Sequence, residues 1–158
     1  MIHRIFLPLI FMFSVQSGYA QNVKARNDTA SIFPKGIRGI ATNFTGVVWS
    51  YPLLADDTVY NCVMGNVTFE PGARSNWHYH QSGQILVITD GVGYYQEKGK
   101  PIELMRKGDV IKCPPNVTHW HGASPDSACT HIAIVTNTQK GVVKWLQPVS
   151  DQEYYKQK

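Results

Sequence analysis

Short runs of β-branched and aromatic residues, divided at regular intervals by turn signals, dominate this chain from Val47 onward. The dividing segments include Pro71-Gly72, Asp90-Gly91 and Lys107-Gly108, in which Gly tolerates a positive φ and Pro fixes its own φ. The strand-like runs between such segments are residues 47–51, 58–69, 76–80, 84–89, 92–96, 109–113, 118–121, 129–136 and 142–146. Many short strands joined by turns are typical of an antiparallel sandwich or barrel, so the sequence predicts an all-β fold.

The last residues of the chain break this pattern. Ser150-Asp-Gln-Glu153 has the spelling of a capping box, in which the first and last side chains each accept a backbone N–H of the other. We therefore expect a short C-terminal helix or tail over residues 151–158.

Length and composition limit the chain to one folded domain. Its 158 residues are 43% apolar and only 16% charged, which suits one core and does not suit a disordered chain. The formal net charge of +4 is small and scattered, which argues against nucleic acid as a partner. We predict a barrel over residues 46–150, preceded by a polar N-terminal arm over residues 21–45.

Residues 1–20 have the order of a secretory signal peptide. Arg4 is followed by an apolar run at 5–15 and then by Ser17-Gly-Tyr-Ala20. The apolar run is shorter than the roughly 20 residues that a membrane-spanning helix needs, although an uncleaved anchor is the alternative. We expect cleavage after Ala20, export to the periplasm or the medium, and no membrane contact afterwards.

Export would permit disulfides, and the chain has 3 cysteines. Cys62, Cys113 and Cys129 all lie inside apolar, strand-like runs. Their odd number and apolar surroundings favour buried free thiols, with one bridge between neighbouring strands as the alternative.

Histidines are the residues most suggestive of chemistry. Apart from His3, all of them fall between positions 78 and 131. His78 and His80 are two apart on one predicted strand, so both side chains project from the same face. The turn at 81–83 would bring Gln84 back beside this pair through an antiparallel hairpin.

A later strand offers a fourth ligand. His119 follows the rigid turn Pro114-Pro-Asn116. Three imidazoles and one amide oxygen suit a divalent transition metal, and manganese, iron, cobalt, nickel and zinc are all chemically admissible. The alternative is that these histidines are structural and are satisfied by backbone hydrogen bonds.

Two spacings in this region resemble the two motifs of the cupin family. The first is Gly72-(x5)-His78-x-His80-(x3)-Gln84-(x6)-Gly91, with Gln in the position usually held by Glu. The second is Gly108-(x5)-Pro114-x-Asn116-(x2)-His119, with Asn for the usual Gly and Ala123 at the usual closing Asn. This resemblance implies a double-stranded β-helix, or jelly-roll, barrel that assembles into a dimer or tetramer of identical chains, with the arm at 21–45 as a segment to exchange.

Further strings are similar to the small bacterial cupins that include manganese-dependent hydroxynitrile lyases. They are Val67-Thr-Phe-Glu-Pro-Gly-Ala-Arg74, His119-Trp-His-Gly-Ala123, Thr130-His131 and Val149-Ser-Asp-Gln-Glu-Tyr154. The chain departs from those lyases in its export signal and in Val135, where they can carry a polar pocket residue. The resemblance implies manganese as the metal and the reversible cleavage of a cyanohydrin to an aldehyde and hydrogen cyanide as the reaction.

In this interpretation His78, His80, Gln84 and His119 hold the metal, and His121 and His131 act as acid and base. A neutral imidazole takes and returns protons near neutral pH, and His131 shares its strand face with Ala133 and Val135. His121 is equally interpretable as a residue that supports the ligands or faces solvent.

The pocket and the competing functions follow from the same patterns. Gly65, Val67, Leu86 and Ile88 have the inward parity to line an apolar pocket, whereas Trp77 and Trp120 face away from the metal. A cupin oxygenase or isomerase acting on an enol, a diketone or a sugar is one alternative to the lyase. A non-catalytic protein that binds a small ligand in the barrel mouth is the other.

Overall fold

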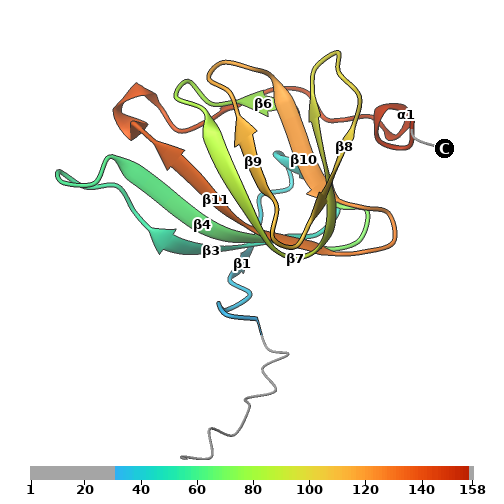
Figure 1. Cartoon of the computed structure of the whole chain (residues 1–158), viewed down its shortest axis with the longest axis horizontal. Helices are drawn as coiled ribbons and strands as arrows, with labels where there is room; N and C mark the ends of the chain where they lie inside the picture. The colour runs from blue at the N-terminus through green and yellow to red at the C-terminus, as the bar shows by residue number, and fades with distance from the viewer. Residues whose placement is uncertain (1–30, 157–158) are drawn as a thin grey trace, which may run out of the picture. The chain divides into compact units, whose positions relative to one another are not determined.

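The computed structural model describes residues 31–156, which form a strongly curled antiparallel β-sheet followed by one short helix (Figure 1). The predicted signal peptide at 1–20, the first part of the predicted arm and the last two residues lie outside the described residues. The strands are β1 (Ile37–Arg38), β2 (Phe44–Thr45), β3 (Val48–Leu54), β4 (Cys62–Phe69), β5 (Arg74–Ser75), β6 (His78–Tyr79), β7 (Gln84–Glu97), β8 (Glu103–Arg106), β9 (Val110–Cys113), β10 (His119–Ala123), β11 (Cys129–Thr136) and β12 (Lys144–Trp145). A 3-10 turn, Thr138–Lys140, precedes β12, and the helix α1 is Asp151–Tyr154. The all-β prediction is confirmed.

Strand pairing runs in the order β1-β3-β4-β11-β7-β10-β5-β2, with β8 and β9 also paired to β7, and β6 paired to β10 and β12. The 14-residue strand β7 joins the two sides of the curl, because its first half pairs with β11 and β9 and its second half with β10 and β8. Strands distant in sequence therefore face each other across the interior.

One prediction about this sheet is wrong. Asp90-Gly91 does not form the expected turn between two strands, because both residues lie inside β7. Gly91 has a φ of 73°, and the ladder with β11 shifts register between Thr130 and His131. A glycine in the left-handed region combined with a bulge bends a strand without reversing it. The result is the curl of β7.

Two groups of buried side chains form the core. The larger group lies within the curl and contains Val48, Phe69, Leu86, Ile88, Tyr95, Met105 and their neighbours. The smaller group contains Trp77, Trp120, Ile102, Val149 and Tyr154. Trp77 and Trp120 thus pack in the core, in agreement with the prediction that their side chains point away from the metal ligands.

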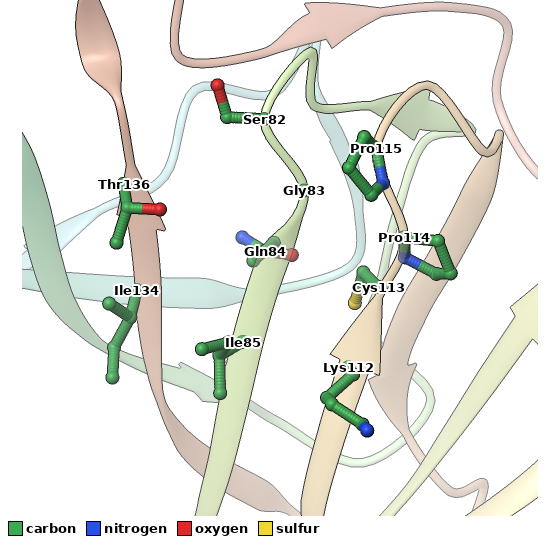
Figure 2. Close-up of a pocket in the computed structure, with 10 residues that line it drawn as sticks. All are labelled: Ser82, Gly83, Gln84, Ile85, Lys112, Cys113, Pro114, Pro115, Ile134 and Thr136. Atoms are coloured by element: carbon green, nitrogen blue, oxygen red, sulfur yellow. The ribbon is translucent and has the colours of Figure 1, made fainter.

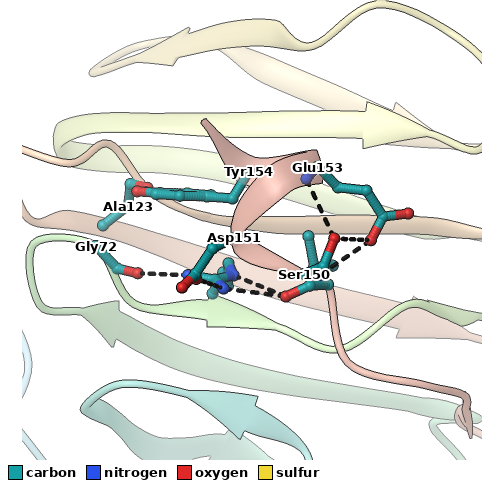
Figure 3. A network of polar contacts seen from close by, with 8 residues as sticks. Gly72, Ala123, Ser150, Asp151, Glu153 and Tyr154 are labelled. Atoms are coloured by element: carbon teal, nitrogen blue, oxygen red, sulfur yellow. Dashed lines mark hydrogen bonds and ion pairs between the residues drawn. The ribbon is translucent and has the colours of Figure 1, made fainter. Parts of the chain in front are cut away.

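The C-terminal helix is tied to the sheet by buried polar contacts (Figure 3). Ser150 caps α1 and exchanges hydrogen bonds with Glu153, which confirms the capping box. The hydroxyl of Tyr154 donates to the carbonyl of Ala123 over 2.8 Å. Arg74, nearly buried, donates from Nε and Nη2 to the carbonyl of Val149, at 3.2 and 3.0 Å. The last residues of the described chain are therefore integral to the fold.

All three cysteines are free thiols, as the sequence predicted. Cys113 and Cys129 are buried, and burial raises the pKa of each thiol to about 12. Cys62, at the start of β4, is only partly buried. Among residues 31–156, no helix has the length and apolar character needed to cross a membrane.

Candidate metal centre

The predicted ligands come from four places in the fold that the strand pairing brings together. His78 lies on β6 and stands opposite His119, the first residue of β10. His80 follows β6, and Gly83 N–H donates to its carbonyl over 3.2 Å, closing a turn that ends at Gln84 on β7. The partners of β6 are β10 and β12, so this tight turn, and not the expected hairpin ladder, returns the chain to Gln84.

Backbone carbonyls orient the three imidazoles. The Nδ1 atom of His78 lies 2.9 Å from the carbonyl oxygen of Asn76, and that of His119 lies 2.8 Å from the carbonyl oxygen of Val117. His80 makes the same kind of contact with a carbonyl of the segment before β12, that of Val142. Because a carbonyl oxygen can only accept, each Nδ1 carries the proton and each Nε2 keeps its lone pair.

His78, His80 and His119 lie close enough together to form a candidate metal site. One ring nitrogen from each lies within 4.8 Å of the others, and all three residues are buried. Bonds of about 2.1 Å from three nitrogens to one ion require separations of roughly 3–4 Å, so the three rings nearly meet this requirement.

The unpaired atoms at this place also fit a cation. The Nε2 atoms of His80 and His119 and the Oε1 atom of Gln84 are buried and have no hydrogen-bond partner. A buried polar atom without a partner costs about 1–3 kcal/mol, which a shared cation would offset. Burial lowers the pKa of all three histidines, that of His119 to about 4, so the imidazoles are neutral and able to ligate. The set of nitrogen and amide oxygen donors suits a first-row divalent metal.

A cavity of about 440 Å³ opens onto three of the four predicted ligands, His78, His80 and Gln84. Its polar lining includes His78, His80, Gln84, His121 and His131, and the other lining residues are mostly apolar. This volume is within the range of small-molecule sites. A small organic ligand in this cavity would lie directly beside the histidine cluster.

The predicted apolar lining is half correct. Gly65 and Val67 line the cavity, whereas Leu86 and Ile88 are packed within the larger core group. Leu86 is fully buried and Ile88 nearly so, and Phe69 and Val48 belong to the same group. Phe44, Val142 and Trp145 also line the cavity and were missed, because their positions depend on long-range pairing.

His131 is fully buried on β11 and lines the same cavity as Ala133 and Val135. Neither of its ring nitrogens has a hydrogen-bond partner. Its ring stacks on Phe69 with centroids 5.6 Å apart, and burial lowers its pKa to about 4. It is thus a neutral imidazole whose two nitrogens are left unpaired by the described residues.

His121 lies between His131 and the cluster. Its ring centroid is 4.9 Å from that of His131 and 5.2 Å from that of His78. Burial, and next the neighbouring His131, hold its pKa well below the usual value. Ser75, which the sequence did not single out, accepts the backbone N–H of His121 over 3.2 Å and lies 3.4 Å from Nδ1 of His78.

A second cavity, of about 380 Å³, lies where β7, β9 and β11 run side by side (Figure 2). Its floor includes the paired residues Ile134, Ile85 and Lys112, in register across the three strands. Lys112 and Cys113 are its only titratable lining residues, and the Cys113 thiol is not acidic. The cavity lined by four histidines is therefore the one equipped for chemistry.

Comparison with known proteins identifies the family of this chain. Residues 65–135 match the family described as Cupin domain. The (R)-mandelonitrile lyase of Granulicella tundricola is 41% identical over 117 residues, which are 74% of this chain and 89% of the lyase. A cupin-like protein from Thermotoga maritima has a crystal structure that is 48% identical, with a TM-score of 0.79 over 80% of this chain and 96% of that one.

More distant structures share the fold alone. A predicted oxalate decarboxylase, also from Thermotoga maritima, is 20% identical, with a TM-score of 0.54 over 59% of this chain and 83% of that one. The family match lies on strands β4 to β11, and the lyase relative is matched over most of its length. The chain belongs to the cupin family.

Proposed function

We propose that this protein is a metal-dependent lyase that cleaves cyanohydrins to an aldehyde and hydrogen cyanide, and that forms them in the reverse direction. The proposal depends on one observation: His131 is a buried, neutral imidazole with two unpaired nitrogens. It lines the same cavity as His78 and His80 of the three-histidine cluster. The identity of 41% to a (R)-mandelonitrile lyase supports the same reaction class.

His78, His80, Gln84 and His119 would hold a divalent ion, which when bound supplies Lewis-acid polarisation of the substrate. We propose manganese, because a neutral amide oxygen completes the donor set and oxygen donors suit manganese among the admissible metals. The donor set has no carboxylate, so the full charge of the ion is retained. This favours acid–base and Lewis-acid chemistry over an oxygenase that passes through a higher oxidation state.

The chain's own residues would move one proton. The free imidazole nitrogen of His131 takes the hydroxyl proton of the cyanohydrin, because burial keeps this ring neutral at pH 7. The carbon–oxygen double bond forms as the bond to the nitrile carbon breaks, and the electron pair of that bond leaves with cyanide. The proton then passes to cyanide, either from His131 directly or through the neighbouring His121. The products are one aldehyde and one hydrogen cyanide, which balances the reaction.

The apolar walls of the cavity serve this reaction in two ways. They bury the organic part of the substrate, and they exclude the water that would compete for the proton on His131. The carbonyl-bound ligand histidines are held in one orientation and do not take part in proton transfer.

The test is cyanohydrin cleavage by protein loaded with manganese. We expect release of benzaldehyde from mandelonitrile, followed by its ultraviolet absorbance, above the rate with metal-free protein. The matched control is His78→Ala, which removes one ligand. Absence of cleavage by the loaded protein contradicts the proposal, and oxygen uptake with a diketone that outpaces cleavage would replace it with the oxygenase alternative.

A further inference from the structure

A row of aromatic rings runs along one side of the cavity, from Trp145 to the buried His131. The ring centroids of Trp145 and Phe44 are 5.4 Å apart, and those of Phe44 and Phe69 are 5.9 Å apart. Phe69 in turn stacks on His131 at 5.6 Å. All four residues line the cavity.

Within this row only Trp145 and Phe44 have exposed surface to offer a ligand. Phe69 is fully buried, so its ring is already covered, whereas Phe44 is partly buried and Trp145 is 36% exposed. Apart from the histidines, the remaining lining side chains are non-aromatic, among them Leu54, Val63 and Val135. The accessible π surface of the cavity is therefore that of Trp145 and Phe44.

Trp145 is held in a defined place beside the metal cluster. It lies on β12, opposite His78 on β6, and the centroids of the two rings are 4.9 Å apart. The carbonyl of Val142, in the same segment, accepts the Nδ1 proton of His80. A flat group resting on Trp145 would thus lie next to His78, one of the predicted ligands.

We propose that Trp145, together with Phe44, is the specificity-determining surface of the cavity and selects a flat aryl group over a saturated one. This inference rests on the proposed function only in taking the ligand to be an aldehyde or a cyanohydrin. Offset or edge-to-face aromatic contacts add about 3- to 10-fold in affinity beyond the burial of apolar area.

The experiment measures binding and needs no turnover. Dissociation constants of benzyl alcohol and cyclohexylmethanol are determined by ligand-observed NMR on the metal-loaded protein. Both compounds carry the same hydroxymethyl group and differ only in the ring. Because the saturated ring is the more hydrophobic, apolar burial alone would favour cyclohexylmethanol. Tighter binding of benzyl alcohol would therefore be due to its flat aromatic ring. We expect a preference of about 3- to 10-fold in the unmodified protein.

The variants separate the aromatic face from general packing. Trp145→Leu should remove the preference and Trp145→Phe should keep most of it. The matched control is Trp49→Leu, because Trp49 lies outside the cavity, where its indole N–H donates to Glu70 and Lys35 lies over its ring. This control should leave the preference unchanged.

Metal content, measured for each variant, separates the outcomes. An unchanged preference in Trp145→Leu with normal metal content overturns the inference. If that variant loses its metal or its fold, Phe44→Leu takes its place, and an unchanged preference there overturns the inference in the same way. The two proposals can fail separately. If Trp145→Leu removes the aryl preference but the unmodified protein does not cleave cyanohydrins, only the proposed function is refuted. If the unmodified protein cleaves cyanohydrins but shows no aryl preference, only this inference is refuted.

Discussion

His78 and His119 stand directly opposite each other on β6 and β10, with ring centroids 4.4 Å apart. Each donates its Nδ1 proton to the carbonyl two residues earlier in its own strand segment, that of Asn76 or Val117. The free nitrogen of each ring is therefore set by a contact within its own segment. Strand register then brings the two free nitrogens together.

Removing one ligand should abolish metal-dependent stabilisation. In the unmodified protein, manganese at about 100 times its dissociation constant should raise the free energy of unfolding by about 2.7 kcal/mol. His119→Ala should lose this gain, because its nitrogen is one of three in the cluster. Thermal melts with and without metal, with elemental analysis, provide the measurement. His131→Ala is the control and should keep the gain; a metal-dependent rise that persists in His119→Ala would contradict the site.

His131→Ala should lower cyanohydrin cleavage by at least about 100-fold, because general acid–base groups contribute factors of about 10²–10⁴. The variant should retain its metal, since His131 is not among the clustered ligands. Steady-state kinetics with mandelonitrile, alongside elemental analysis, test both statements. Activity that survives undiminished would show that His131 is not the base, and the same assay on His121→Ala decides how the two histidines share the proton.

Acid should destabilise the metal-free protein partly through His131. Burial lowers its pKa from 6.5 to about 4, so between these values the unfolded chain binds a proton that the folded chain does not. Stability conferred by this group is therefore present above pH 6.5 and is lost as the pH falls toward 4. The loss amounts to about 3 kcal/mol at most, from about 1.36 kcal/mol per pKa unit.

Urea unfolding at pH 7 and pH 4.5 measures this loss. The four other buried histidines also have lowered pKa values, so only the difference between the unmodified protein and His131→Leu isolates the group. We expect the variant to lose about 2–3 kcal/mol less between the two pH values. Equal losses in both proteins would place the acid sensitivity elsewhere.

Tyr154→Phe should lower the free energy of unfolding by about 1–2 kcal/mol, because it deletes a buried hydrogen bond to the carbonyl of Ala123. Tyr155→Phe is the control, because Tyr155 is the next residue and is 45% exposed. Removing its hydroxyl should change the free energy of unfolding by less than about 0.5 kcal/mol. Denaturant unfolding compares the two. Equal effects would mean that the hydroxyl of Tyr154 does not secure the C-terminal helix.

The sequence predicted those parts of the site that depend on local geometry. The alternation of side chains along a strand was enough to place His78 and His80 together and to turn Trp77 and Trp120 away. The capping box was likewise readable, because its partners are three residues apart.

What escaped prediction depends on pairing between distant segments. Ser75 contacts His121 because β5 lies beside β10, and Trp145 reaches the cavity because β12 pairs with β6. Nor could the sequence distinguish a turn at Gly91 from a bend, since both use a positive φ. Only the bulge in the ladder with β11 decides between them.

The unequal burial of the three cysteines has a practical consequence. A thiol reacts as its thiolate, and the pKa of about 12 leaves Cys113 and Cys129 essentially inert to alkylating reagents at pH 7. Cys62 is partly exposed and lies on the face of β4 opposite to the cavity residue Val63, so it is left as the natural attachment point for a single fluorophore. The protein thus carries, without engineering, one site for a fluorescent label that lies outside its cavity and leaves the cavity residues unmodified.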